Sequence, residues 1–578
     1  MKAHLLYRDR DFDLQQKLPA NEPALTQDLE LNTLFRAMAG GDEFLFHVAK
    51  RTVLSGLEND LATILYRQAI LKDCLRNEAA VREIYDIAVE AIETKRTHWL
   101  GVFSRYPSGI LYEAVKLLQM LMGVLAKLKR VADEAGRARS PLSAVNAEGQ
   151  TSISERRARS DAPYQFESEG FKTFFEMLKA ELADDYFAAV EAQLKELEFK
   201  DGVLVSAELG EGNQGVNYVL RKSLRPRPGW FQRIFLRNSS AYTFHIDPRD
   251  DGGFRALSEL QDRGINLAAN AVAQAADHIT SFFVMLRTEL AFYIGCLNLQ
   301  HQLAWKGMPV CFPVPVPSGT RKQTCVGLRD ACLALVCGRD ASAREKKTVP
   351  SGLPIGTGDA ASPLPSATRA SQPPVVGNDL AADGKNLIII TGANQGGKST
   401  FLRGVGLAQL MMQCGMFVAA DSFSADLCRS LFTHYKREED ATMTSGKFDE
   451  ELARMSGIAD ALTSTLRSAT EDGSDSLLLF NESFAATNER EGSEIARQIV
   501  RALLETRVKI FFVTHLYEFA RTFWEDKMDS AVFLRAERQA DGQRTFKLLP
   551  GEPLETSFGA DLYQEVFESG NERKVLTP

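Results

Sequence analysis

Apolar residues recur with helical spacing through most of the N-terminal third of the chain. One stripe has the three-and-four spacing of a helix face and consists of Leu61, Ile64, Leu65, Gln68 and Leu71, with polar residues on either side. The segment 109–136 repeats this spacing and closes at Gly136, a residue type that favours a helix C-terminus. The spacing predicts helices over 28–135 and 165–199, separated by a polar loop at 137–163.

The pattern changes at residue 200. Two short strand-like runs flank a turn that contains Gly and Asn, which predicts a β-hairpin within 200–248. The segment 221–237 is rich in basic and aromatic residues. Helical spacing then returns over 253–305, which is long enough for a lever of two or more joined helices.

The C-terminal part of the chain has a third kind of pattern. Residues 338–374 are rich in Ser, Pro, Gly and Ala, and we expect a flexible surface insertion there. Beyond it, apolar strand-like runs such as "NLIIITG" and "KIFFVTH" alternate with amphipathic helical segments. This alternation predicts βαβ units on a parallel sheet, so the expected fold is an all-α region with a small β-rich insertion, followed by an α/β domain.

Composition narrows the class of protein. The 578 residues are 44% apolar and 25% charged, which is typical of a globular protein and sufficient for three or four domains. Uninterrupted apolar runs stay well short of the roughly 20 residues that cross a bilayer, and the N-terminus lacks the apolar core of a signal peptide. The eight cysteines form no CxxC pair. We expect a cytoplasmic protein with no membrane partner.

A net charge of −8 gives no overall attraction to nucleic acid, although a local basic surface can still bind phosphate.

One segment of the chain matches a phosphate-binding pattern. Residues 392–399 fit G-x-x-x-x-G-K-[ST], with an apolar strand before them and a helix after them. The glycines let backbone N–H groups converge on phosphate oxygens at the positive end of the helix. We expect Lys398 to neutralise the β- and γ-phosphates and Ser399 Oγ to ligate Mg²⁺. The complete context disfavours a chance glycine loop. The predicted nucleotide-binding residues are Gly392, Ala393, Asn394, Gln395, Gly396, Gly397, Lys398, Ser399 and Thr400.

The next apolar strand ends in Asn481-Glu482, where P-loop ATPases have Asp-Glu. Glu482 is the predicted general base that polarises the attacking water. Asn481 keeps an acceptor oxygen but lacks the charge, so we expect it to reach Mg²⁺ through a water and to bind it weakly. His515, at the end of "KIFFVTH", is placed to sense the γ-phosphate. The alternative interpretation of His515 is an ordinary histidine at the end of a strand. We predict slow ATP hydrolysis, with a catalytically dead ATP-binding protein as the alternative.

These residues together resemble the MutS family of DNA mismatch repair ATPases. The family's TGPNMGGKST loop is similar to TGANQGGKST here, its Thr-His switch to Thr514-His515, and its segment after the Asp-Glu pair to 486–492. The segment 445–452 resembles the family's signature loop, which in the family crosses a dimer toward the other subunit's nucleotide. The resemblance therefore implies a trans role for Ser445, Phe448 and Glu451, and it places Asn378 near the adenine.

The resemblance also implies a division into domains and an ABC-type ATPase fold. The expected ranges are an N-terminal extension at 1–30, a helical core and lever at 31–199, a degenerate clamp-like β insertion at 200–250, returning lever helices at 251–318, and the ATPase domain at 319–578.

The chain departs from the family in ways that bear on function. The helical core is expected within about thirty residues of Met1, which leaves no place for the family's mismatch-reading wedge domain or connector domain. We interpret Phe44, Phe46 and Phe174 as core residues and not as a wedge. The basic residues that would grip a DNA backbone are Arg221, Lys222, Arg225, Arg227, Arg233 and Arg237, and a solvated loop is an equally good interpretation.

Only nineteen residues follow Gly559, so we expect the family's terminal dimerisation element to be shortened or absent. Dimer formation is then expected to depend on ATP.

We therefore predict a MutS-like ATPase that uses ATP and Mg²⁺ and forms an ATP-gated homodimeric clamp. Its expected partner is mismatched, branched or recombination-type double-stranded DNA, in DNA repair or recombination. The alternative is a nucleotide-dependent protein scaffold or regulator that binds ATP without binding DNA.

Overall fold

A computed structural model describes ten stretches of the chain. They are residues 1–98, 106–137, 164–199, 202–221, 246–337, 375–437, 446–468, 476–506, 508–539 and 542–554. The contacts divide the chain into two compact units. One comprises Met1–Leu5 with Arg76–Leu290, and the other comprises Leu6–Leu75 with Ala291–Pro578. This division does not follow the predicted domain boundaries, which remain predictions.

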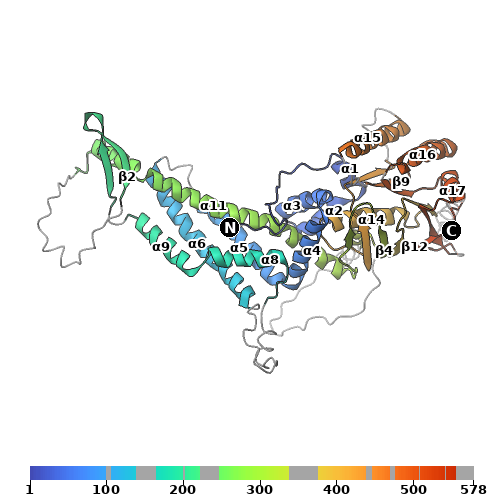
Figure 1. Ribbon diagram of the computed structural model, residues 1–578, viewed down its shortest axis with the longest axis horizontal. Helices are drawn as coiled ribbons and strands as arrows, with labels where there is room; N and C mark the ends of the chain where they lie inside the picture. Colours follow the sequence, from blue (N-terminus) through green and yellow to red (C-terminus); the bar gives the residue numbers. More distant parts are fainter. Residues whose placement is uncertain are drawn as a thin grey trace, which may run out of the picture. The chain divides into compact units, whose positions relative to one another are not determined.

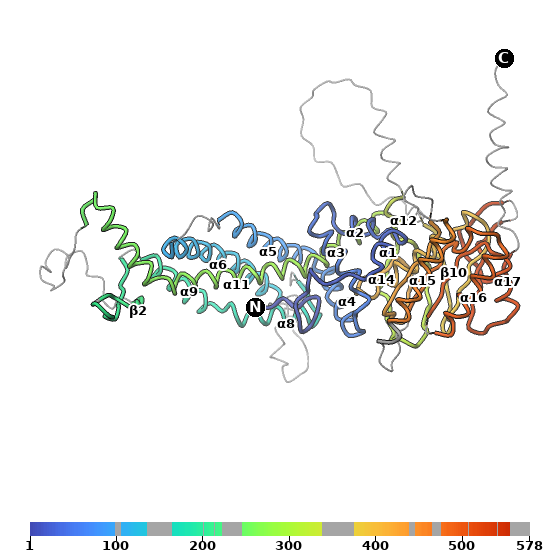
Figure 2. The backbone as a smooth tube through the Cα atoms, turned by 90° about the horizontal axis from the view of Figure 1, so that it is seen from above, coloured from blue at the N-terminus to red at the C-terminus, as the bar shows by residue number. Residues whose placement is uncertain are grey.

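The first unit is built from long helices that lie alongside one another (Figures 1 and 2). Their contacts include an ion pair between Lys95 and Asp277 and a hydrogen bond from Ser108 N to Asp262 Oδ1. The helices are α5 (Glu78–His98), α6 (Pro107–Arg137), α8 (Glu169–Glu181), α9 (Asp184–Leu197) and the first part of α11 (Asp251–Trp305). The helical patterns predicted from the sequence are thus present. Two details differ, because the segment 253–305, expected to form two or more joined helices, is one helix, and α6 continues through Gly136 to Arg137. Phe174 is buried, as expected of a core residue, whereas Phe44 and Phe46 of the other unit are only half-buried.

A β-hairpin interrupts the helices, as the sequence predicted for this region. Strands β1 (Val205–Leu209) and β2 (Gly215–Leu220) pair antiparallel around a short 3₁₀ turn, η2 (Glu211–Asn213). Residues 222–245 lie outside the described residues. The hairpin is present, and its role as a clamp stays a prediction.

The second unit begins with short helices. They are α1 (Glu22–Asp28), α2 (Leu31–Ala39), α3 (Glu43–Leu54), the 3₁₀ helix η1 (Ser55–Glu58), α4 (Leu61–Arg76, whose last residue belongs to the first unit) and, later in the chain, α12 (Ala331–Val336). Aspartate side chains cap the N-termini of α3 and α12. The Asp42 carboxylate accepts from the backbone N–H groups of Phe44 and Leu45, and the Asp330 carboxylate accepts from Leu333 N.

A six-stranded sheet forms the centre of the second unit, in the order β12-β11-β6-β10-β9-β8. The pairs formed among β6, β8, β9, β10 and β11 are parallel, and β12 is antiparallel to β11. The predicted βαβ arrangement is therefore present. The strands are β6 (Leu387–Gly392), β8 (Ser430–Tyr435), β9 (Ser476–Asn481), β10 (Val508–Val513), β11 (Ala531–Arg538) and β12 (Arg544–Pro550).

Helices cover both faces of this sheet (Figure 1). On one face α15 (Lys447–Ser468), α16 (Glu489–Leu504) and α17 (Tyr517–Glu525) share a core with Leu478, Phe480 and Phe512 of the strands. On the other face lies α14 (Lys398–Gln413), where a Cβ at Gly406 would touch Leu479. The strands are almost entirely buried, which explains their uninterrupted apolar sequences.

A smaller sheet lies beside the large one, in the order β3-β7-β4-β5. Its strands are β3 (Val314–Val316), β4 (Gln323–Leu328), β5 (Asn378–Ala381) and β7 (Ser422–Asp426). The predicted insertion at 338–374 falls between β4 and β5 and lies outside the described residues.

Two helices of the described chain are long and apolar enough to cross a membrane, judged by length and composition alone. They span Pro107–Ala135 and Asp251–Trp305, and 44% and 78% of their most apolar windows are buried inside the protein. Core helices of globular proteins meet the same criterion.

Candidate active site

The phosphate-binding pattern forms a loop between β6 and α14. Gly392 and Gly397 have φ angles of 105° and 88°, in the region that favours glycine. Gly396 has no room for a side chain, because a Cβ there would lie 2.6 Å from Ala536 Cβ and 2.8 Å from Ala393 O. Gly392 and Gly397 are therefore favoured by their φ angles, and Gly396 by the lack of space for a Cβ. The loop brings the N-terminus of α14 to the carboxyl edge of the sheet.

Lys398 is the first residue of α14 and is 5% exposed. Its ammonium donates to Gly392 O at 2.9 Å and to Ala393 O at 3.1 Å, and it lies 3.9 Å from Glu482 Oε1. Burial lowers the Lys398 pKa, and the nearby Arg544 lowers it further while Glu482 opposes the shift. The loop thus holds a buried cation whose hydrogen bonds to carbonyls can be exchanged for hydrogen bonds to phosphate.

Ser399 and Asn481 meet at the same edge. Ser399 Oγ donates to Asn481 Oδ1 at 2.8 Å, which joins the start of α14 to the end of β9. Both groups offer oxygens, the ligand atoms that Mg²⁺ prefers, but both oxygens are neutral. The pair fits the predicted arrangement, in which Ser399 ligates the ion and Asn481 reaches it through a water, but Asn481 supplies no negative charge.

Glu482 lies directly after β9 with a φ of 54°, an unusual value for a residue with a side chain. Its carboxylate pairs with His515 Nδ1, and His515 follows β10, the strand next to β9. The hydrogen bond to Glu482 raises the His515 pKa. The structure therefore brings Lys398, Glu482 and His515 together, from three separate parts of the sequence.

A cavity of about 530 Å³ opens beside these residues. Its polar lining comes from the loop residues, Glu482 and Asn378. Its apolar lining comes from Leu333, Val375, Val376 and Phe546. Such a mixed lining suits a ligand that has both a charged group and a flat apolar group.

Phe546 is a residue that the sequence analysis missed. Its side chain is 47% exposed although it is aromatic, and its φ is 59° within β12. Nothing in the segment "RTFKLLP" indicates that its single aromatic residue lines a binding site. Its position depends on the pairing of β12 with β11 and of β11 with β6.

The other predicted nucleotide-binding residues line the cavity to different extents. Asn378 lines the cavity, and its side-chain amide also makes two hydrogen bonds to the backbone of β12. It donates to Phe546 O at 3.1 Å and accepts from Leu548 N at 2.7 Å. Asn378 thus positions Phe546. The predicted loop residues that line the cavity are Asn394, Gln395, Gly396, Gly397, Lys398, Ser399 and Thr400. Gln395 also accepts from Arg544 at 3.2 Å, while Gly392 and Ala393 contribute their carbonyls to Lys398.

The segment predicted to act across a dimer is described only in part. Ser445 lies outside the described residues. Phe448 is half-buried and packs on the core between the sheet and α15–α17. Glu451 is 3% exposed, and its carboxylate accepts from Phe484 N of the same chain at 3.0 Å. A trans role for this segment stays a prediction.

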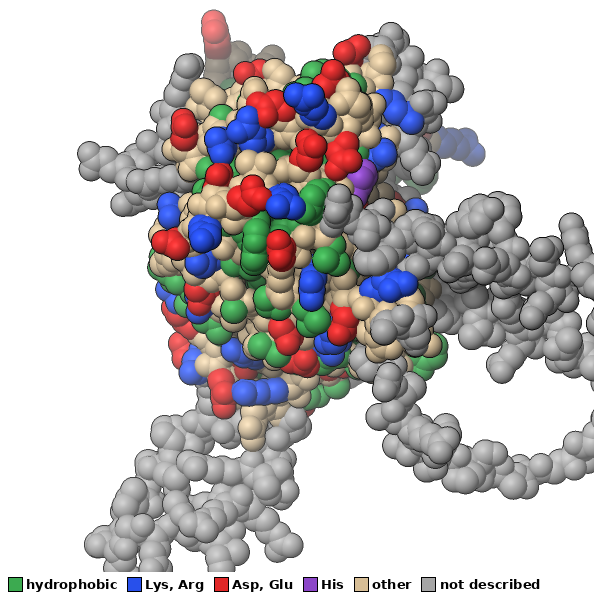
Figure 3. All heavy atoms as spheres, turned by 90° about the vertical axis from the view of Figure 1, so that its right-hand side faces the viewer, with side chains coloured by type: hydrophobic (Ala, Val, Ile, Leu, Met, Phe, Trp, Pro, Cys, Tyr) green, Lys and Arg blue, Asp and Glu red, His purple; other side chains and the backbone are tan. Residues whose placement is uncertain are grey.

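The predicted DNA contacts are described at a single residue. Arg221 ends the hairpin, with its backbone N donating to Leu204 O and its Nε donating to Ser206 Oγ. Lys222, Arg225, Arg227, Arg233 and Arg237 lie outside the described residues. On the face shown in Figure 3, acidic and basic side chains of the described residues are intermingled.

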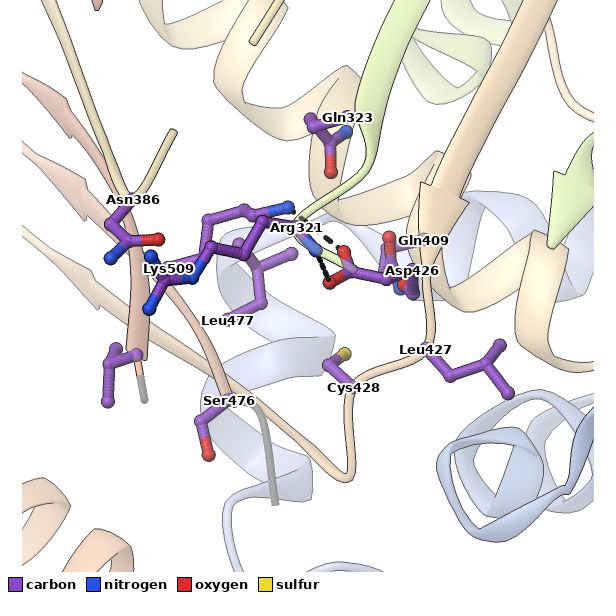
Figure 4. Close-up of a pocket in the computed structure, with 11 residues that line it drawn as sticks. Arg321, Gln323, Asn386, Gln409, Asp426, Leu427, Cys428, Ser476, Leu477 and Lys509 are labelled. Atoms are coloured by element: carbon purple, nitrogen blue, oxygen red, sulfur yellow. Dashed lines mark hydrogen bonds and ion pairs between the residues drawn. The ribbon is translucent and has the colours of Figure 1, made fainter. Parts of the chain in front are cut away.

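A second polar cluster lies at the opposite edge of the large sheet (Figure 4). Lys509 Nζ at the start of β10 pairs with Asp426 Oδ1 at 2.9 Å, and both side chains are 9% exposed. Asp426 Oδ2 accepts from Arg321 N at 3.0 Å, and Lys509 also donates to Lys322 O. The adjoining cavity measures about 20 Å³, which is room for one water. This cluster joins the two sheets and is far too small for a nucleotide.

Two family models match the sequence. The model described as MutS2 N-terminal domain matches residues 59–141 and 153–306, and the model described as MutS domain V matches residues 388–566. The second match contains the phosphate-binding loop, Asn481, Glu482 and His515.

Curated relatives match about a quarter of the chain. MutS protein homolog 4 of Homo sapiens is 31% identical over 149 residues, which is 26% of this chain and 15% of that protein. DNA mismatch repair protein MutS of Chloroflexus aurantiacus is 33% identical over 159 residues, 27% of this chain and 15% of that protein. Endonuclease MutS2 of Thermus thermophilus is 36% identical over 145 residues, 25% of this chain and 18% of that protein. The chain thus aligns with less than a fifth of the length of each of these relatives.

Proposed function

Because the chain belongs to the MutS family, we propose that its second unit binds and hydrolyses ATP and that two copies close around double-stranded DNA when ATP is bound. The observation that carries this proposal is the meeting of Lys398, Ser399, Asn481 and Glu482 beside one cavity with an apolar wall. We place the protein in the cytoplasm, in DNA repair or recombination.

Each group has a role in this reaction. Loop N–H groups and Lys398 bind the β- and γ-phosphates, and the apolar wall, including Phe546, receives the adenine. Ser399 and Asn481 would hold Mg²⁺, which would supply positive charge to the phosphates. A water attacks the γ-phosphorus, the bond to the β–γ bridging oxygen breaks, and Glu482 takes the water's proton. His515 fixes the direction of the Glu482 carboxylate.

ATP would gate the clamp through its preference for the closed dimer. The gain in dimer affinity equals the difference between ATP binding to the closed and to the open state. We propose mismatched, branched or otherwise distorted DNA as the target, and hydrolysis as the step that reopens the clamp.

The reaction is tested by ATP turnover and nucleotide affinity in the full chain. Lys398→Glu should abolish both, because it places a negative charge against the phosphates. Lys385→Ala is a matched control, because Lys385 lies just before the opposite end of β6 and donates to Asp529 O. Wild-type affinity in Lys398→Glu would refute the assignment of the site.

DNA binding is tested separately by filter binding across a salt titration and by turnover with linear, mismatched and four-way-junction DNA. A clamp on the phosphate backbone gives a negative log–log slope of several units. Failure of each DNA to bind and to change turnover would leave the ATPase intact and refute the clamp.

A second candidate is a nucleotide-dependent protein scaffold that does not bind DNA. The net charge of −8 favours it. For this candidate the salt titration should retain no DNA even at low salt, while self-association still depends on ATP.

A further inference from the structure

The turn that follows Glu482 has an unusual conformation. Phe484 has a φ of 62° and is fully buried, although a bulky side chain disfavours this region of backbone. Its ring stacks on His434, with centroids 5.3 Å apart and planes 20° apart. A Cβ at Gly492 in α16 would collide with Phe484 O, so the turn is confined from that side as well. Two residues in the left-handed region, Glu482 and Phe484, thus flank Ser483.

Helix α15 holds this turn through the side chain of Glu451. The Glu451 carboxylate accepts from Phe484 N at 3.0 Å. Glu451 is 3% exposed, so the hydrogen bond forms away from water, where losing it would leave a buried N–H unpaired. Burial raises the Glu451 pKa, and the Phe484 N–H opposes that shift.

His434 makes a second connection between α15 and the turn. Its Nε2 lies 3.0 Å from Glu451 O, and its Nδ1 lies 2.8 Å from Ser483 Oγ. A carbonyl can only accept, so Nε2 carries the proton. Burial lowers the His434 pKa to about 4, so the ring is neutral at physiological pH. The single hydroxyl proton of Ser483 is donated to His434 O at 2.5 Å, and Nδ1 can share it only as the second acceptor of a bifurcated hydrogen bond.

These contacts fix the residues on either side of Ser483, and Glu482 is one of them. The backbone of Glu482 is anchored on the sheet, because Glu482 N donates to Val513 O at 2.9 Å. The Glu482 backbone is thus held by β10 on one side and, through the following turn, by α15 on the other, and its carboxylate lies beside Lys398 and His515.

We propose that His434, Glu451, Ser483 and Phe484 form a turn latch by which α15 positions the Glu482 carboxylate of its own chain for hydrolysis. Glu451 is then a positioning residue that acts in cis. This inference rests on the proposed ATPase function. Because α15 begins with the segment that resembles the family's signature loop, anything that binds there and shifts α15 will change turnover through the latch.

The latch predicts an effect on turnover without an effect on nucleotide binding. Glu451→Ala and Ser483→Ala should each lower kcat about 10-fold or more, because small misplacements of a catalytic group are costly. The KM for ATP should stay within about twofold, because the loop and Phe546 are unchanged. Glu451→Gln, whose amide oxygen can still accept from Phe484 N, should recover most of the rate. Asp449→Ala is the matched control, since Asp449 is an exposed carboxylate in the same turn of α15.

A double mutant separates positioning from general damage to the fold. If Glu451 acts only through Glu482, adding Glu451→Ala to Glu482→Gln should leave the residual rate unchanged. Hydrogen exchange should also become faster in the peptide that contains 482–484 when Glu451 is replaced by Ala. Additive losses, unchanged exchange, or an unchanged kcat in Glu451→Ala would each overturn the latch. A wild-type chain that binds or hydrolyses no ATP would instead refute the proposed function, and the latch with it.

Discussion

Replacing Asn481 with Asp restores a negative charge where the oxygens around the expected magnesium site lack one. Asn481 Oδ1 accepts from Ser399 Oγ at 2.8 Å, and the two side chains have the same shape in the variant. A carboxylate oxygen at this position keeps the hydrogen bond and adds an electrostatic attraction to any cation bound by Ser399. The substitution therefore changes the charge of the side chain and leaves its shape almost unchanged.

The size of the effect follows from the position of the side chain. A group that reaches Mg²⁺ through one water lies roughly 4 Å from the ion. At that distance two unit charges attract by about 1 kcal/mol in bulk water, so a divalent ion gains about 2 kcal/mol. Asn481 is only partly exposed, so the bulk-water value is the smallest effect to expect. A gain of about 2 kcal/mol corresponds to about a 30-fold tighter affinity.

The assay is ATP turnover by the full chain across a magnesium titration. Asn481→Asp should lower the half-saturating Mg²⁺ concentration about 30-fold, and it should raise turnover at limiting magnesium. Asn481→Ala, which removes the oxygen, should shift the half-saturation in the opposite direction. An Asp variant whose magnesium dependence equals that of the wild type would refute the placement of Asn481 in the metal's surroundings.

Three further outcomes follow from the structure. Phe546→Ala should weaken nucleotide binding about 10-fold, measured with a fluorescent ATP analogue, because stacking on an aromatic ring contributes about 1–3 kcal/mol per base; equal affinity would remove Phe546 from the site. Lys509→Met should destabilise the second unit by about 3–5 kcal/mol by leaving Asp426 buried and unpaired, and Lys509→Met/Asp426→Leu should recover stability in denaturant titrations. His434, whose pKa burial lowers to about 4, stays neutral in the folded chain while the unfolded chain protonates below about pH 6.5. The unfolded state then binds more protons, so the free energy of unfolding should fall as pH falls from 6.5 to 4, and thermal melts of His434→Gln should lack this slope.

The residues predicted from short patterns are the ones that the structure brings together. The loop before α14 is specified locally, since strand, glycines, Lys398 and helix follow one another directly in the sequence. Asn481, Glu482 and His515 were also predicted locally, because each comes at the end of an apolar strand-like run. The structure brings them together because the carboxyl ends of neighbouring parallel strands meet at one edge.

Residues whose position depends on distant pairing could not be predicted in the same way. Phe546 reaches the cavity only because β12 pairs with β11, which in turn pairs with β6, more than 150 residues earlier in the chain. The resemblance implied a trans role for Glu451, which stays a prediction, but no spacing in the sequence indicates its buried contact with Phe484 across 33 residues. The Asp426–Lys509 pair is another case, because it joins two sheets.

Backbone strain distinguishes the candidate site from an inert glycine loop. Among the described residues, ten non-glycine residues have positive φ, and Gln395, Glu482, Phe484 and Phe546 are four of them. Three of the four line the cavity, and Phe484 holds the turn beside it. Each such residue costs on the order of 1–2 kcal/mol, and a fold keeps it only where the surroundings enforce it. Each of the four also takes part in a hydrogen bond to a neighbouring element. Gln395 Oε1 accepts from Arg544, the Glu482 carboxylate pairs with His515, Phe484 N donates to the Glu451 carboxylate, and Phe546 O accepts from Asn378. A loop without a ligand has no reason to concentrate this cost at one cavity, whereas a site that must hold a phosphate, a base and a nucleophilic water in fixed positions does.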